Sequence, residues 1–148
     1  MNPWTSSYKA HQGNAGLGRA LAYYTANGIP IMLPLNDTQK YDLVVDKDDK
    51  LLRVSVKTTQ AKNKNGSCYV VLLKNCGGSS GKSVIRKFDN TSIDIVFVVT
   101  IDGSMYEIPS NEIEITGSLT LTSEWDKYIV TLDWGTSAQE EILDVEEG

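Results

Sequence analysis

Apolar residues repeat along the chain at two spacings, one typical of a helix and the other typical of strands. Leu17, Leu21 and Tyr24 follow an i, i+4, i+7 pattern, which predicts an amphipathic helix that ends at Asn27–Gly28. Three glycines crowd the expected start of this helix: Gly13, Gly16 and Gly18. The first regular element is therefore expected to be an N-terminal helix.

Two runs rich in β-branched and aromatic residues follow, Tyr41–Asp46 and Leu51–Lys57. The polar segment Lys47–Lys50 joins them, which predicts a hairpin. In the second run apolar and polar residues alternate strictly, so we expect one core face and one polar face. Folding the hairpin about its polar turn places Asp42 opposite the neighbourhood of Val54–Val56.

The remaining pattern adds further short strands and one Gly/Ser-rich loop, Asn75–Ser83. The expected extended segments are Ile29–Pro34, Cys68–Lys74, Ile93–Thr100, Met105–Ile108 after a turn at Asp102–Gly103, Leu119–Leu121 and Tyr128–Leu132. No linker divides the chain, so residues 1–148 are expected to form a single α+β domain with a mixed central sheet and a flanking N-terminal helix.

Composition narrows the class of protein. The chain has 148 residues, 41% hydrophobic and 22% charged, as in an ordinary globular domain. No apolar run approaches the ~18 residues of a membrane span, so we expect a cytoplasmic protein without membrane association. Cys68, Cys76 and the single His11 are too few for a structural zinc site, and no nucleophile lies beside His11 in the sequence.

Charge is distributed unevenly. The net charge is -5, yet residues 50–88 contain no Asp or Glu and hold nine of the 14 basic residues. A local positive field of this kind suits a phosphate backbone, although a solvated basic face is the plainer explanation. The acidic tail, about residues 136–148, is compatible with fraying, with pairing to the basic stretch or with repulsion of non-specific DNA.

The hairpin brings together a small set of polar side chains. Ser55 and Lys57 project from the same face of their strand, and Asp42 lies opposite, where the loop Asn36–Lys40 meets the sheet. This geometry could hold a hard divalent cation on oxygen ligands with an ammonium beside it. A strand-start Asp42 bonded to a turn, with an exposed Lys57, is the structural alternative.

Three stretches together resemble the PD-(D/E)XK nuclease superfamily: Gly13–Tyr24, Leu33–Asp46 and Val54–Thr59. The resemblance is greatest to small group I intron homing endonucleases and Holliday-junction-resolvase-like enzymes, and it spans about residues 13–115. It implies a restriction-endonuclease-like core, hydrolysis of phosphodiester bonds in double-stranded DNA with Mg²⁺ or Mn²⁺, and a homo-oligomer, either a dimer or a tetramer. A catalytically weakened or inactive DNA-binding module with the nuclease fold is the alternative.

By this resemblance Asp42 matches the metal-binding aspartate, Lys57 the motif lysine, and the Val56 backbone carbonyl completes the metal shell. Ser55 occupies the (D/E) position, often Gln in the intron-nuclease branch, and reaches a cation only through water. A second departure lies on the first helix, where many relatives carry Glu and this chain has Leu17, with Asn14 one turn earlier.

Five basic residues are expected to contact the DNA backbone: Lys62, Lys64, Lys82, Arg86 and Lys87. The run ending in Gly81-Lys82-Ser83 also invites comparison with a phosphate-binding P-loop. The first glycine of that motif is replaced by Cys76, and no long helix is predicted after Ser83. A nucleotide triphosphatase is therefore disfavoured.

Overall fold

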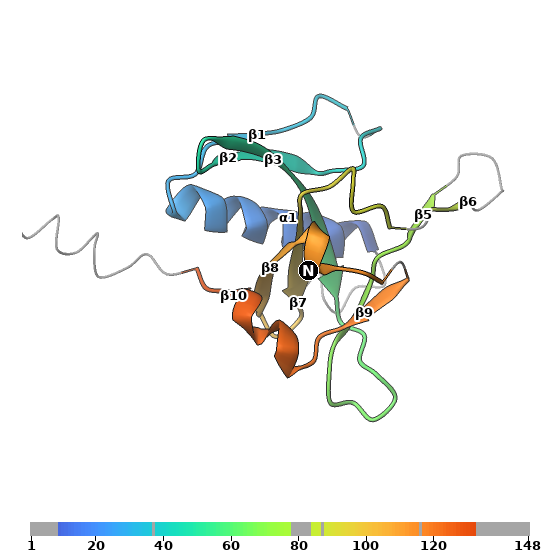
Figure 1. Cartoon of the computed structure of the whole chain (residues 1–148). Coiled ribbons are helices and arrows are strands. Elements are labelled where there is room, and N and C mark those ends of the chain that lie inside the picture. The colour runs from blue at the N-terminus through green and yellow to red at the C-terminus, as the bar shows by residue number, and fades with distance from the viewer. Residues whose placement is uncertain (1–8, 37, 78–83, 87, 116, 133–148) are drawn as a thin grey trace, which may run out of the picture.

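The computed structural model describes residues 9–36, 38–77, 84–86, 88–115 and 117–132 (Figure 1). Within these ranges one helix and ten short strands are formed, with two 3₁₀ segments. Their bounds are α1 (Lys9–Ala26), β1 (Ile31–Met32), β2 (Leu43–Lys47), β3 (Lys50–Thr59), β4 (Val70–Leu72), β5 (Asn75–Gly77), β6 (Val84–Arg86), β7 (Ile95–Thr100), β8 (Met105–Pro109), η1 (Ser110–Glu112), β9 (Ser118–Thr120), η2 (Ser123–Tyr128) and β10 (Ile129–Val130).

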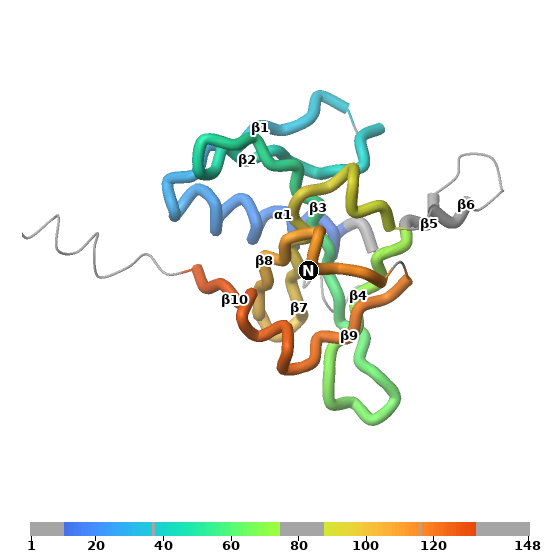
Figure 2. Tube along the Cα trace, viewed as in Figure 1, coloured from blue at the N-terminus to red at the C-terminus, as the bar shows by residue number. Residues whose placement is uncertain are grey.

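A six-stranded mixed sheet organises the fold, in the order β1-β2-β3-β7-β8-β10. The β3–β7 pair is parallel, whereas the other four pairs are antiparallel. Two small antiparallel pairs, β4–β9 and β5–β6, lie outside this sheet, and Figure 2 shows the first of them beside the lower end of β3. The expected α+β class, with a mixed sheet and an N-terminal helix, is confirmed.

The β2–β3 hairpin forms as the alternation predicts. Asp48 and Asp49 adopt positive φ angles of 54° and 61°, the conformation of a two-residue turn that matches the twist of the strands. Leu43 pairs with Val54, so Asp42 falls opposite Ser55. The predicted register is therefore confirmed.

Helix α1 ends where the pattern predicts but begins earlier. It stops at Ala26, and Gly28 takes a φ of +69°, as expected for a glycine that terminates a helix. Its first residue is Lys9, so the expectation that the three glycines mark the helix start is wrong. One of them lies against β3: a Cβ atom added to Gly16 would lie 1.8 Å from Cγ2 of Thr58.

The sheet separates two apolar cores. On one face α1 lies across β3 and β7, and the core there includes Tyr24, Leu43, Val54 and Phe97 (Figure 1). On the other face β4, β9 and η2 cover the sheet around Ile108. Both faces of β7 are thus covered, which explains why all six of its residues are buried.

Other segments differ in detail from expectation. The strand predicted at Cys68–Lys74 is confined to β4, and residues 75–77 of the predicted Asn75–Ser83 loop form β5, paired with β6. A strand rather than a helix follows Ser83, in agreement with the rejection of the P-loop. Residues 78–83 lie outside the described ranges. The part of the chain that the structure describes has no helix that is both long and apolar enough to cross a membrane.

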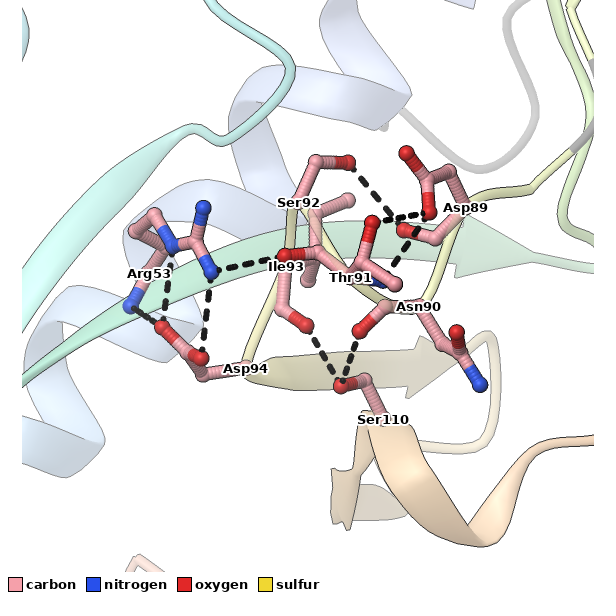
Figure 3. A network of polar contacts seen from close by, with 8 residues as sticks. All are labelled: Arg53, Asp89, Asn90, Thr91, Ser92, Ile93, Asp94 and Ser110. Carbon is pink, nitrogen blue, oxygen red and sulfur yellow. Dashed lines mark hydrogen bonds and ion pairs between the residues drawn. The ribbon is translucent and has the colours of Figure 1, made fainter.

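The turn that leads into β7 is held by a polar network, drawn in Figure 3. The Asp94 carboxylate accepts hydrogen bonds from the backbone N–H of Arg53 at 2.8 Å and from its Nε at 3.0 Å, and Arg53 also donates to the carbonyl of Thr91 at 3.0 Å. Arg53 therefore pairs with a carboxylate distant in sequence, and its charge adds less to the basic stretch than the sequence suggests. Ser110 closes the network by donating to the carbonyl of Ile93.

Candidate active site

Asp42 is fixed against the middle of β3 by its own backbone and side chain. Its N–H donates to the carbonyl of Val54 at 2.8 Å, and its Oδ2 accepts from the N–H of Val56 at 2.7 Å. A carboxylate has about four lone-pair positions, so one amide bond leaves acceptor capacity for a cation. The start of the first hairpin strand thus presents a positioned anionic oxygen at the edge of the sheet.

The Val56 carbonyl points to the same edge. Backbone groups of successive residues in a strand alternate between its two neighbours, whereas the N–H and C=O of one residue point the same way. The carbonyl of Thr59 accepts from the N–H of Ile101 and so faces β7, whereas the N–H of Val56 faces Asp42. The Val56 carbonyl and the Asp42 carboxylate therefore offer two hard oxygen ligands on one side of β3.

Lys57 is half-buried beside this edge. Burial lowers its pKa, and the negative charge of Asp42 opposes that shift. The pKa of Asp42 is raised by the protein packed around its carboxylate, against the lowering effects of the Val56 N–H and of Lys57. Asp42 is nevertheless exposed as a residue, so protein surrounds its carboxylate only on the inner side. The charges of Asp42 and Lys57 therefore interact.

Ser55 is buried, whereas Asp42 opposite it is exposed. Ser55 is only 2% exposed and pairs with Val96 of β7. A short, buried hydroxyl adds no charge to a cation site. Among the described residues no group of three or more His, Cys, Asp or Glu side chains is placed to hold a metal ion. Asp42 is therefore the one carboxylate that the described contacts assign to this site.

One carboxylate and one carbonyl fit Mg²⁺, which keeps several waters and often binds proteins through only one or two carboxylates. Thiolate or imidazole ligands, which suit zinc, are not among these residues. The residues present are therefore compatible with a hard divalent cation and with weak binding of it.

The sequence and the fold were compared with those of known proteins. The sequence profile of PD-(D/E)XK endonucleases matches residues 8–127. This chain belongs to the PD-(D/E)XK endonuclease family. Among solved structures, the bacterial homing endonuclease I-Ssp6803I has a TM-score of 0.70 at 22% identity, over 96% of this chain and 97% of that chain. No curated protein matches the chain.

The restriction-endonuclease-like fold predicted from the resemblance is thereby confirmed. In this PD-(D/E)XK endonuclease, Asp42 and Lys57, which were predicted to be the motif aspartate and lysine, interact electrostatically. Ser55 lies opposite Asp42 in the β2–β3 register. Helix α1 has no Asp or Glu, so it supplies no second carboxylate. Leu17 packs against the α1-facing core and Asn14 is exposed.

The basic residues predicted to contact DNA are distributed differently. Lys62 and Lys64 are exposed in the segment after β3, five and seven residues beyond Lys57. Arg86 belongs to β6, with only its backbone described, whereas Lys82 and Lys87 lie outside the described residues. Of the five predicted DNA contacts, the described part of the chain therefore shows Lys62 and Lys64 as exposed side chains, and their contact with DNA stays a prediction.

Sequence patterns missed two features that support the site. The contact between Gly16 and Thr58 sets the distance of α1 from β3 one residue after Lys57. Lys40 forms an ion pair with Asp89 at 3.7 Å, which links the loop before Asp42 to the turn before β7. The glycine was visible in the sequence, but its partner lies about 40 residues away, and no local pattern identifies such a pair.

Proposed function

We propose that this PD-(D/E)XK endonuclease is a metal-dependent, homing-endonuclease-like enzyme that hydrolyses phosphodiester bonds in double-stranded DNA. The observation that carries the proposal is the Asp42 carboxylate, bonded to the Val56 amide, close to the half-buried Lys57. Family membership and the likeness to a homing endonuclease support it. A water molecule would form a new P–O bond at the scissile phosphorus while the P–O bond to the leaving strand breaks. The attacking water gives up a proton, and the leaving oxygen takes up a proton to become a hydroxyl.

Each residue of the site has a distinct role in this reaction. Asp42 and the Val56 carbonyl would hold Mg²⁺ or Mn²⁺, which supplies Lewis-acid polarisation of the phosphate. Lys57 would lie beside the phosphate, where either its ammonium form offsets developing negative charge or its neutral form accepts a proton from water. The lowered pKa of Lys57 makes the neutral form more accessible at neutral pH.

A homo-oligomer, dimer or tetramer, is part of the proposal. Each chain carries one Asp42–Lys57 site, which acts on one scissile phosphate at a time. Cleavage of both strands in a single encounter therefore requires a second copy, most simply one related by two-fold symmetry.

We propose that this activity takes place in the cytoplasm.

A supercoiled plasmid tests the proposal directly. The wild-type chain is expected to convert supercoiled DNA to nicked and then linear forms only when Mg²⁺ or Mn²⁺ is added, and EDTA is expected to stop the reaction. A cation titration measures the affinity of the site, which is expected to be weak because only one carboxylate is present. Absence of nicking at every cation concentration contradicts the enzymatic proposal.

A DNA-binding module without cleavage is the second candidate. It is favoured by the buried neutral Ser55 and by the lack of any carboxylate on α1. The two candidates separate in one experiment, since a module would retard a DNA duplex in a gel without nicking plasmid in the presence of Mn²⁺.

Replacing Ser55 by glutamine or glutamate is expected to raise cleavage. A longer side chain brings its oxygen toward the edge where Asp42 lies, and an added ligand strengthens binding of a hard cation. Initial nicking rates at limiting Mg²⁺ measure the effect, for which we expect about a tenfold gain, or about 1.4 kcal/mol in the barrier.

Ser55→Ala is the matched control, since it removes only the hydroxyl from the same buried position. It is expected to leave the nicking rate nearly unchanged. If the glutamine, glutamate and alanine variants all nick more slowly than wild type at an unchanged melting temperature, Ser55 is instead an adapted ligand.

A further inference from the structure

Immediately after β3 the chain forms a projecting hairpin, residues 60–69 (Figure 1, the green loop below β9). Lys62 and Tyr69 form an antiparallel bridge, and the N–H of Asn63 donates to the carbonyl of Cys68 at 2.9 Å. The N–H of Val70 donates to the carbonyl of Ala61, also at 2.9 Å. The two arms are thus paired like a short β-ribbon.

The tip of this 60–69 hairpin is held by two asparagines. Oδ1 of Asn63 accepts from the N–H groups of Ser67 and Cys68 at 3.0 and 3.2 Å. Oδ1 of Asn65 accepts from the N–H of Ser67 at 3.1 Å and from its Oγ at 2.6 Å. Gly66 supplies the positive φ of 72° that the turn requires. The tip is therefore preorganised although its side chains are exposed.

These contacts decide which groups the tip offers to a partner. A backbone N–H can only donate, so the atom of Asn65 that faces Ser67 is the oxygen, and its Nδ2 amide is the donor end. Lys64 is exposed beside it, whereas Lys62 lies over the ring of Tyr69 at 4.9 Å and within the field of Asp102. Lys64 and Asn65 thus offer two donors at the exposed tip, the Lys64 ammonium and the Asn65 amide.

Position and width suit a DNA groove. Lys57 is three residues before the base of the hairpin and eight before Asn65 at its tip, about 10 Å and about 25 Å along an extended strand. A two-stranded ribbon fits the major groove of B-DNA, which is about 12 Å wide. Residues 60–69 contain no acid, so nothing on the hairpin repels phosphate.

We propose that the 60–69 hairpin enters the major groove several base pairs from the cleaved phosphate and reads base edges there through Lys64 and Asn65. The proposal rests on the DNA-cleaving function argued above. Two adjacent donors favour the base that shows two acceptors, so the hairpin selects guanine through O6 and N7. This goes beyond backbone contact, which positions DNA without reading it.

A selection from a random-sequence duplex library tests the proposal. The full chain binds the library with Ca²⁺ in place of Mg²⁺, and sequencing of the bound fraction reveals the preferred motif. Wild type is expected to enrich guanine at one or two neighbouring positions. Asn65→Ala is expected to lower the ratio of motif to scrambled-duplex affinity about tenfold without changing the salt dependence, because no charge is removed.

Two further variants sharpen the test. Asn65→Asp keeps Oδ1 for Ser67 but replaces the donor by an acceptor, so enrichment of guanine is expected to disappear while the melting temperature is retained. Lys50→Ala removes an exposed lysine at the opposite end of β3 and is expected to leave the motif unchanged.

The outcomes separate this proposal from the function on which it rests. If wild type binds and enriches a motif that both Asn65 variants retain, the hairpin does not read bases and only this inference fails. A uniform loss of affinity with an unchanged motif for Lys64→Ala would make the hairpin a phosphate anchor and also overturn it. If wild type binds no DNA, the proposed function fails as well.

Discussion

Asp42→Asn and Lys57→Ala are each expected to reduce metal-dependent nicking on the order of a thousandfold, about 4 kcal/mol in the barrier. Asparagine removes the anionic charge that holds a cation but keeps an oxygen that accepts from the Val56 N–H. The β2–β3 register is therefore expected to survive, and the loss would be chemical rather than structural. Initial rates on supercoiled plasmid, together with thermal unfolding, measure both effects.

Matched controls exist on the same hairpin. Asp46 is an exposed aspartate of β2, and Lys50 is an exposed lysine at the start of β3. Asp46→Asn and Lys50→Ala make the same chemical changes away from the site and are expected to cleave like wild type. Undiminished nicking by Asp42→Asn or Lys57→Ala would refute the assignment of the active site.

Asp42→Ala provides a further distinction, because alanine removes both the charge and the acceptor for the Val56 N–H. We expect cleavage to be abolished as with asparagine, with an added loss of stability of roughly 1 kcal/mol for the missing hydrogen bond. Equal melting temperatures for the alanine and asparagine variants would show that this bond contributes little to the fold.

Gly16→Ala is expected to destabilise the protein by about 1–3 kcal/mol, the usual cost of overpacking. The added Cβ would lie 1.8 Å from Cγ2 of Thr58, closer than any real contact, so either the helix or the strand must move. Thr58 is β-branched and has little rotamer freedom with which to yield. For a chain of this size each kcal/mol shifts the melting temperature by roughly 2–4 °C, which thermal unfolding resolves.

Gly18→Ala is the matched control on the same helix. Gly18 is exposed, and a Cβ added there would have no heavy atom within 4 Å. Alanine is therefore expected to stabilise the helix by about 0.5–1 kcal/mol through its higher helix propensity. A shift of the same sign at both glycines would contradict the close approach of α1 to β3.

Removing the opposing methyl group should rescue the Gly16 variant. Thr58→Ala leaves only its Cβ, 3.4 Å from the new methyl, so the double variant is expected to recover most of the lost stability. Because Thr58 follows Lys57 directly, the single Gly16→Ala variant is also expected to lower the nicking rate, and the rescue should restore it.

Local pattern was sufficient for the part of the fold that carries the site. Strict alternation and a polar turn define the β2–β3 hairpin. This hairpin alone places Asp42 opposite Ser55, which is two residues before Lys57 on β3. The end of α1 was equally local, because Gly28 takes up a conformation that other residues adopt only with strain. Short-range geometry governs such elements, so neighbouring residues suffice to predict them.

Contacts between distant segments decided the rest. The parallel pairing of β3 with β7 buries Ser55, and the Asp94 carboxylate neutralises Arg53. Helix α1 begins at Lys9 although glycines disfavour helices. One of these glycines, Gly16, packs against β3 at a position where a side chain would not fit. Burial and charge at a residue depend on which strand lies beside it, and in this sheet that strand comes from about 40 residues further along the chain.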